Sequence, residues 1–317
     1  MKFLKFLEGL RTPFFDTVFS VITHLGEETV FIIVGLLFFW CIDKKKGYYI
    51  LSVGFIGTLL NQFLKLLFRI PRPWVKDPSF TIVESARAEA SGYSFPSGHT
   101  QSSVGVFGAI ARSAGKWSMR GLCITACVLV PLSRMYLGVH TPLDVGVSVG
   151  IALLLVFGLY PIINRSMQSK YCMYPVLLSM ILLSVLYLLF VLLFPFPADI
   201  DVANYESGLK NAYKLLGCTL GILVAYVIDE RYLHFETGST FLGQVLKLLL
   251  GLIPLLAIKE GLRLPLDLLF GGSKVADGVR YFLLTAVAGG VWPMIFPFLN
   301  RIALKMTKKT SKSSSAS

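Results

Sequence analysis

Long runs of apolar residues, separated by short polar stretches, dominate the pattern of the chain. The clearest runs, which carry few or no charged residues, are 31–40, 50–60, 145–159, 174–194 and 282–299. Each run, together with its flanks, approaches the roughly 20 residues that a helix needs to cross a bilayer. The pattern therefore predicts an all-α protein, built as a polytopic bundle of membrane-spanning helices.

The same pattern gives approximate positions for the individual apolar helices. They are expected at 26–42, 47–68, 97–114, 119–138, 142–163, 173–194, 210–228, 240–258 and 278–300. The stretch 261–276 is too short and too interrupted to span, so it is expected to be re-entrant or interfacial. As domains, we expect an N-terminal segment at 1–25, a core at 26–164, an extension of about three spanning helices at 165–300 and a disordered basic tail at 301–317.

The N-terminal segment, residues 1–25, has a different periodicity. Its apolar side chains recur at helical spacing with charged residues between them: Phe3, Phe6, Leu7, Leu10 and Phe14. This spacing predicts an amphipathic helix that lies in the membrane interface. A secretory signal peptide is not expected, because Lys5, Glu8 and Arg11 interrupt the uncharged stretch that it requires.

The distribution of charged residues distinguishes a membrane protein from a nucleic-acid-binding protein. The net charge is +12, from 30 Lys and Arg against 18 Asp and Glu. No basic stripe with interleaved aromatic residues is present, so no nucleic-acid partner is expected. The basic clusters at 44–46, 116–120, 165–170 and 301–312 instead fall on one side if the helices alternate, and this side is then cytoplasmic. We expect an integral protein of the plasma membrane or of an internal eukaryotic membrane.

The five cysteines, Cys41, Cys123, Cys127, Cys172 and Cys218, lie mostly inside apolar runs without metal-ligand spacing. They are therefore expected to be small core residues rather than a disulfide framework.

Three clusters of polar residues lie at the ends of apolar helices. They are KLLFRIPRP, with Lys65 and Arg72; PSGH, with Ser97, Gly98 and His99; and SRMYLGVHTPLD, with Arg134, His140 and Asp144. Singly, each residue has a structural explanation, such as a snorkelling cation or, for Asp144, a capping box with Thr141.

The order of the helices brings the three clusters to one membrane face. Lys65 lies near the end of the second spanning helix and His99 begins the third; Arg134 ends the fourth and His140 begins the fifth. Because successive helices cross in opposite directions, all four side chains reach the same face. Several cations and a helix N-terminus that meet there favour a tetrahedral dianion such as phosphate. The phosphate-binding residues expected are Lys65, Arg72, Ser97, Gly98 and Arg134.

The two histidines and the aspartate suggest the reaction. A neutral His140 can attack phosphorus and form a phosphohistidine, while Asp144 accepts the other ring N–H and fixes the tautomer. His99 can protonate the departing alkoxide and later activate water. No carboxylate cluster is available on that face, so neither a metal nor another cofactor is expected.

In order and internal spacing, the three clusters resemble the signature of the type-2 phosphatidic acid phosphatase superfamily of lipid phosphate phosphatases. The resemblance implies a six-helix phosphatase core, a phosphohistidine mechanism and a lipid phosphate substrate. Leu25-Gly26-Glu27, before an apolar run, is similar to the opening of the sphingosine-1-phosphate phosphatase branch. The helices after 173 also resemble that branch, or the glucose-6-phosphatase branch.

Two alternatives stay open beside hydrolysis: a phosphotransferase that uses the same intermediate, and a lipid-phosphate transporter without catalysis. The substrate also stays open among a sphingoid-base phosphate, phosphatidic acid and an isoprenyl phosphate or diphosphate. In each case the parity of the helices places the site on the side away from the cytoplasm.

Overall fold

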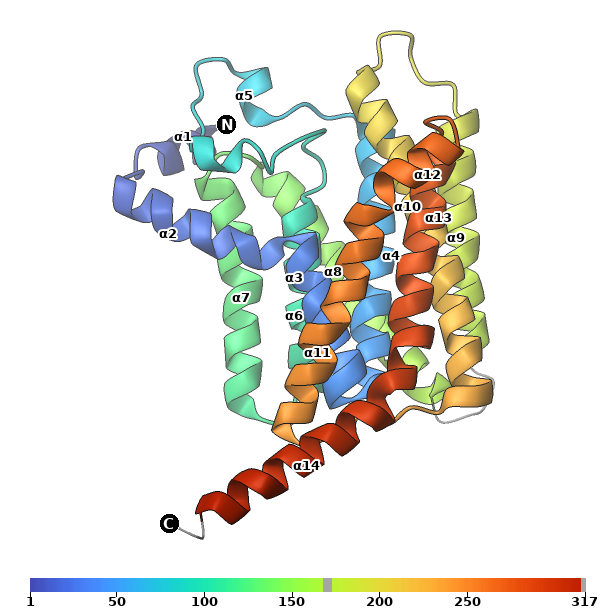
Figure 1. Cartoon of the computed structure of the whole chain (residues 1–317). Helices are drawn as coiled ribbons and strands as arrows, with labels where there is room; N and C mark the ends of the chain where they lie inside the picture. The colour runs from blue at the N-terminus through green and yellow to red at the C-terminus, as the bar shows by residue number, and fades with distance from the viewer. Residues whose placement is uncertain (168–172, 315–317) are drawn as a thin grey trace. The chain divides into compact units, whose positions relative to one another are not determined.

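The computed structural model describes residues 1–167 and 173–314, and within them the chain is helical with no β-strand (Figure 1). Seven helices in this part of the chain are long and apolar enough to cross a membrane. A further pair of helices, bent by 52° at its break, raises the number to eight if it counts as one span. The prediction of an all-α polytopic bundle is confirmed.

The expected helices are present, with some changes at their ends. The α-helices are α1 (Lys2–Glu8), α2 (Pro13–Thr23), α3 (Glu28–Leu37), α4 (Lys44–Phe68), α5 (Pro73–Lys76), α6 (Gly98–Ser113), α7 (Trp117–Tyr136), α8 (Pro142–Ser166), α9 (Met173–Leu193), α10 (Val202–Ile228), α11 (Phe241–Leu256), α12 (Arg263–Leu269), α13 (Val275–Ala286) and α14 (Phe296–Ser314). Two of the nine expected spans are not among the seven: α6 has only 16 residues, and α3 belongs to the bent pair with α2.

The chain forms two compact units that are not continuous in sequence. The first contains Met1–Gly35, Tyr48–Ser169 and Leu193–Gly208, and the second contains Leu36–Gly47, Lys170–Leu192 and Leu209–Ser317. The segment 36–47 belongs to the second unit because Trp40, which is fully buried, donates its indole N–H to the carbonyl of Ala288 at 2.9 Å. The segment 193–208 belongs to the first unit, where Phe196 lies under the guanidinium of Arg69.

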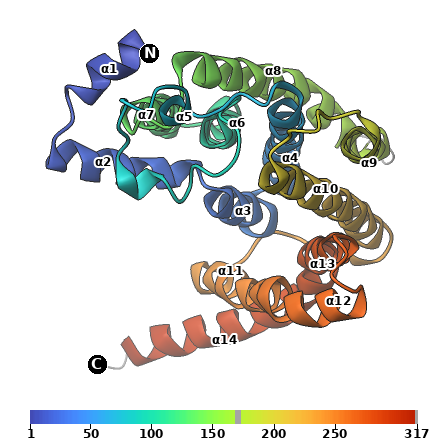
Figure 2. The ribbon, with the colours of Figure 1, turned by 90° about the horizontal axis from the view of Figure 1, so that it is seen from above.

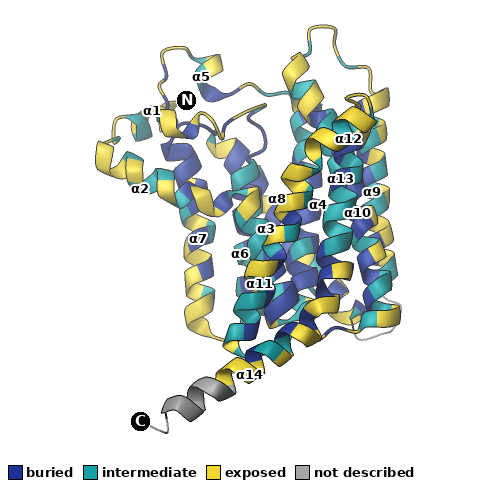
Figure 3. Cartoon of the chain, viewed as in Figure 1, coloured by how far each residue is buried: buried dark blue, intermediate teal, exposed yellow. Residues whose placement is uncertain are grey.

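In the first unit, α6 packs against both α7 and α8 (Figure 2). Its buried face includes Val104, Val106 and Ala109. α7 also has apolar side chains that no other part of the chain covers: Leu122, Ile124 and Val128 are more than half exposed (Figure 3). Exposed apolar side chains of this kind are compatible with contact to lipid tails, which are as apolar as the interior of a protein.

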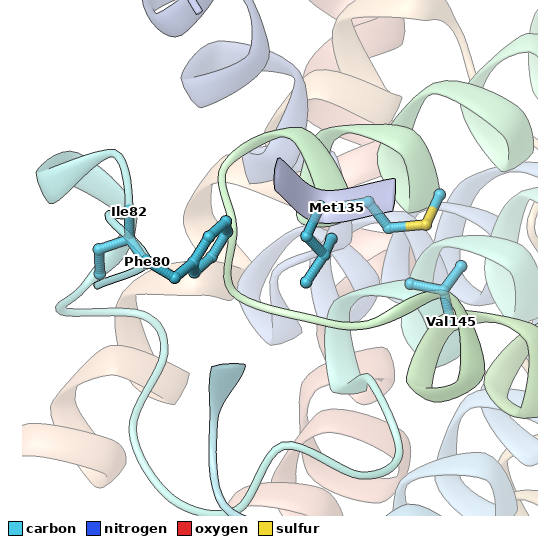
Figure 4. Packing of buried hydrophobic residues seen from close by; sticks show 5 residues of the cluster. Phe80, Ile82, Met135 and Val145 are labelled. Carbon is cyan, nitrogen blue, oxygen red and sulfur yellow. The ribbon is translucent and has the colours of Figure 1, made fainter. Parts of the chain in front are cut away.

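The N-terminal segment contains two short helices where one amphipathic helix was expected. Pro13 has no N–H to continue a helix, and the side chain of Thr12 caps α2 by accepting the Phe15 N–H at 3.3 Å. Leu4 is completely buried in a cluster with Phe80, Ile82, Met135 and Val145 (Figure 4). The segment is therefore packed onto the loop before α6 and onto the adjoining ends of α7 and α8.

Two of the expected helices differ from the structure in their bounds. α10 begins eight residues before 210 because its polar first turn is capped by Asp201, whose carboxylate accepts the Asn204 N–H. The helix expected at 278–300 is interrupted after α13 by a π-helical turn, η6 (Val287–Val291), and a 3-10 turn, η7 (Trp292–Ile295), which contains Pro293.

The tail expected to be disordered is helical in α14, where Ala303 is completely buried. The stretch 261–276 holds the short helix α12, which is too short to span. Cys41 and Cys123 are buried, Cys127 and Cys218 are partly exposed, and Cys172 lies outside the described residues.

Within the second unit, α10 and α13 approach closely through glycines. A Cβ atom on Gly217 would lie 2.0 Å from the carbonyl oxygen of Gly278, and one on Gly221 would lie 2.1 Å from the Thr285 hydroxyl. These glycines are four residues apart, which is the small-residue spacing that lets membrane helices pack at short distance.

We predict that Gly217→Ala lowers the thermal stability of the detergent-purified protein by several degrees. Overpacking of this kind costs about 1–3 kcal/mol because helix backbones must separate. Gly150→Ala is the matched control, because a Cβ atom there meets no other atom within 4 Å. Equal melting temperatures for the two variants would contradict the close packing of α10 and α13.

Candidate active site

Arg72 connects two loops of the first unit, the loop before α6 and the turn between α7 and α8. It is the N-cap residue of α5, and only 5% of it is exposed. Its Nε and Nη2 atoms donate to the carbonyls of Gly92 and Ser91 at 3.0 and 2.9 Å. Its Nη1 atom donates to the carbonyl of Val139 at 3.0 Å and lies 2.9 Å from Nε2 of His140. The loop before α6 is thereby fixed to the turn between α7 and α8.

His140 lies in that turn with 1% of its surface exposed. Because a guanidinium can only donate, Nε2 accepts from Arg72, and the neutral imidazole carries its proton on Nδ1. Nε2 is then the nitrogen with a free electron pair. Nδ1 lies 3.6 Å from Oδ2 of Asp144, which is too long for a hydrogen bond.

Asp144 has the structural role that its sequence context predicted and also lies beside His140. Its Oδ2 accepts the Thr141 N–H at 2.7 Å, and its own N–H donates to the Thr141 hydroxyl, which completes the capping box at the start of α8. The same oxygen accepts the hydroxyl of Ser94 at 2.6 Å. The carboxylate is therefore held in one orientation, 1% exposed, next to the histidine.

The N-terminus of α6 is fixed against α8. Ser97 caps the helix, since its hydroxyl accepts the Thr100 N–H at 3.4 Å, and its backbone N–H donates to the carbonyl of Asp144 at 3.2 Å. The hydroxyl of Ser148 donates to the carbonyl of Ser97 at 2.9 Å. Gly98 and His99 form the first turn, and the buried Nε2 of His99 has no hydrogen-bond partner in the described chain.

The two remaining cations come from the ends of α4 and α7. Lys65, in the last turn of α4, donates to the carbonyl of Tyr93 at 2.8 Å. Arg134, in the last turn of α7, is completely buried and donates through Nη1 to the hydroxyl of Thr23 at 2.8 Å. Its Nε and Nη2 have no partner among the described residues. These unused donors, with Nε2 of His99, are suited to an anion.

The electrostatics of the two histidines follow from burial and from these cations. Burial lowers the pKa of His140 well below its ordinary value, and Arg72, Arg134 and Lys65 lower it further. The pKa of His99 is lowered by burial, Arg134, Arg72 and Lys65 in the same way. Both rings are therefore neutral at pH 7. A phosphate dianion among the cations would offset their charge and raise the pKa of His99.

All eight predicted site residues belong to the first unit. Side chains that sequence reasoning missed also hold the site: Ser94, Ser148, Thr23 and Asn61, whose amide donates to the carbonyl of Pro96 at 3.3 Å. These residues carry no local signal, because their contacts join segments far apart in the chain. Among the described residues, no three His, Cys, Asp or Glu side chains are close enough to hold a metal ion.

Comparisons with known proteins match both parts of the chain. Residues 45–168 match the PAP2 superfamily, and residues 213–304 match the family described as PAP2 superfamily phosphatase, transmembrane extension. The first match contains every predicted site residue. Together with the seven span-length helices in the described residues, the second match identifies an integral membrane protein.

Similar proteins include phosphatases from three organisms. Sphingosine-1-phosphate phosphatase 1 of Mus musculus is 25% identical over 77% of this chain and 58% of its own length. A probable sphingosine-1-phosphate phosphatase of Dictyostelium discoideum is 29% identical over 77% of this chain and 60% of its own. Phosphatidylglycerophosphatase B of Bacillus subtilis is 31% identical over 45% of this chain and 74% of its own.

The chain thus spans less than two thirds of the length of these two sphingosine-1-phosphate phosphatases. No solved structure gives a significant match to the chain.

We predict that acid destabilises the protein partly through His99. The unfolded chain takes up protons at histidines that the folded chain keeps neutral, so stability is present above about pH 6.5 and is lost as the pH falls toward the lowered pKa. Melting temperatures between pH 7 and pH 5 should fall more steeply for the wild type than for His99→Gln, by about 2–4 °C at most. Equal slopes for wild type and His99→Gln would contradict the lowered pKa.

Proposed function

The chain belongs to the PAP2 superfamily, and from this membership we propose that it is a membrane phosphatase that hydrolyses a lipid phosphate through a phosphohistidine intermediate. The observation that carries the proposal is the setting of His140. Its Nε2 is paired with the Arg72 guanidinium at 2.9 Å, and its Nδ1 faces the Asp144 carboxylate at 3.6 Å. A phosphate that replaces His140 as the partner of Arg72 would lie against the free electron pair of Nε2.

In the first step, Nε2 of His140 attacks phosphorus while the bond from phosphorus to the lipid oxygen breaks. His99, protonated once the dianion is bound, gives its proton to the leaving alkoxide through Nε2. In the second step, the now neutral His99 takes a proton from water, whose oxygen attacks phosphorus as the P–N bond breaks. Inorganic phosphate is released and His140 is again neutral.

The cations stabilise charge on the phosphoryl oxygens during both steps. Arg134 supplies its unpartnered Nε and Nη2, Lys65 supplies an ammonium group, and Arg72 supplies the guanidinium beside the nucleophile. Ser97 and the backbone N–H of Gly98 add the N-terminus of α6, which favours negative charge. Such fixed donors are the usual source of catalysis in phosphoryl transfer, where positioning and charge stabilisation dominate.

Asp144 stabilises His140 once the ring becomes positively charged on phosphorylation. Its distance from Nδ1 has to shorten from 3.6 Å to hydrogen-bond length for a direct contact. The capping box and Ser94 limit the movement of the carboxylate, so the ring of His140 makes the adjustment as it leaves Arg72.

The names of the relatives support a lipid substrate for this chain. Their substrates, as named, are sphingosine-1-phosphate and phosphatidylglycerophosphate, which share a phosphate monoester at the end of a lipid. The candidates for this chain are a sphingoid-base phosphate, phosphatidic acid and an isoprenyl phosphate or diphosphate. The positive-inside distribution supports a site that faces away from the cytoplasm.

We predict that the detergent-purified protein releases phosphate from lipid phosphates in the presence of EDTA. His140→Ala should lower kcat by at least about 10³-fold, because no other group can form the covalent intermediate. His234→Ala, at an exposed histidine between α10 and α11, is the control and should keep wild-type activity. Loss of activity in EDTA, or full activity of His140→Ala, would contradict this mechanism. A separate incubation with a second alcohol tests whether the protein transfers phosphate to an acceptor other than water.

We predict that His99→Asn discriminates between classes of substrate. A monoester releases a poor alkoxide leaving group and needs the acid, which contributes about 10²–10⁴-fold. A lipid diphosphate releases a phosphate monoester, which leaves more easily, so the variant should lose much less activity on it. Equal losses of kcat on a matched isoprenyl phosphate and diphosphate would argue against His99 as the acid.

A further inference from the structure

The corner between α2 and α3 lies before the residues that match the PAP2 superfamily, yet it contacts the site. It consists of Thr23, at the end of α2, and the 3-10 turn η1 (His24–Gly26). We propose that this corner is part of the active site, with Thr23 as a positioning residue for Arg134 and Gly26 as a positioning residue for His99. The inference rests on the proposed function, since it concerns how the groups of that site are aimed.

Thr23 holds the guanidinium of Arg134. Its hydroxyl accepts from Nη1 at 2.8 Å, and both residues are buried, with 4% and 0% of their surfaces exposed. In the described residues this is the single hydrogen bond from that guanidinium to the protein, because Nε and Nη2 have no partner. The long, flexible side chain of Arg134 is thus oriented by the hydroxyl of Thr23. This hydrogen bond determines where the unpartnered Nε and Nη2 groups point.

Gly26 lies against the first turn of α6. A Cβ atom at this position would be 2.8 Å from the carbonyl oxygen of His99, 2.9 Å from its Cβ and 3.0 Å from a methyl group of Val130. Two of these atoms belong to His99 itself, so a side chain at position 26 would displace that histidine or the helix that carries it. The absence of a side chain therefore sets the distance between the corner and the candidate acid.

The helix before the corner is fastened to α7, the helix that carries Arg134. The ring of Phe19 packs on the ring of Tyr136 at 4.3 Å between centroids, and the Tyr136 hydroxyl donates to Asp16 at 2.9 Å. Thr23 is one to two turns further along the same helix α2. These contacts hold α2 against the end of α7, and from there Thr23 presents its hydroxyl to Arg134.

The primary test compares Thr23→Val with Thr23→Ser in the full-length protein. Valine keeps the shape but removes the acceptor, whereas serine keeps the hydroxyl. Thr23→Val should lower kcat by about 10- to 100-fold, the range for a lost hydrogen bond to a charged group, with KM changed by less than about threefold. Thr23→Ser should stay within about threefold of the wild type, and both should keep the wild-type melting temperature within a few degrees.

A second readout does not require turnover. Orthovanadate, which adopts the five-coordinate geometry of the transition state, should raise the melting temperature of the wild type. Its apparent affinity should be at least about tenfold weaker in Thr23→Val than in Thr23→Ser. Thr23→Val within twofold of wild type in kcat and in vanadate affinity would overturn the proposal, and so would equal losses in the two variants.

Gly26→Ala tests the other contact and should lower kcat by more than tenfold, because His99 is displaced. Gly121→Ala is its matched control, since a Cβ atom there meets nothing within 4 Å, and it should be active. Unchanged activity in Gly26→Ala would remove Gly26 from the proposal. If the wild type hydrolyses no lipid phosphate, the proposed function fails, but the vanadate titration still tests the role of Thr23. If the wild type does not bind vanadate, both the proposed function and the role of Thr23 are overturned.

Discussion

The guanidinium of Arg72 makes the contacts on which the rest of the site depends. Its hydrogen bonds reach Ser91 and Gly92 in one loop and Val139 and His140 in another. These loops start from α4 and α7, helices that are separated in sequence by the whole of α6. A planar group with five N–H donors can join two loops and a ring nitrogen at once, which a lysine cannot do.

Buried charge explains why such a site favours an anion. Arg72 and Arg134 are 5% and 0% exposed, and Asp144 is the one buried carboxylate paired with His140 in the described first unit. An isolated cation is costly to bury, and backbone carbonyls and one hydroxyl offset this cost only in part. A phosphate dianion would supply the missing negative charge, and the same charge would return a proton to His99. In the proposed mechanism, phosphate binding and acid catalysis by His99 are thus coupled through the charge balance of the site.

The position of the site follows from helix ends rather than from any single helix. Lys65 and Arg134 lie in the last turns of α4 and α7, while His99 and Asp144 lie in the first turns of α6 and α8. Helix termini leave backbone N–H and carbonyl groups unpaired, and these groups need polar partners. The caps of Ser97 and Thr141 meet that need. In the proposed mechanism, Ser97 and Asp144 therefore combine a role at a helix N-terminus with a role at the site.

The sequence alone determined the helical class and most of the spans, because the length of an apolar run is a local property. Helix parity also indicated that the eight candidate site residues lie on one face, and the structure places all eight in the first unit. The sequence also predicted the capping box of Thr141 and Asp144, whose partners are three residues apart. It did not predict the break at Pro13, the helical tail of α14 or the segment 36–47 in the second unit, where distant packing decides. Only the tertiary structure showed the hydrogen bonds of Ser94 to Asp144 and of Arg134 to Thr23, because these contacts join residues 50 and 111 positions apart. It alone also showed that Gly26 lies against His99, since a residue without a side chain gives no signal of a distant contact.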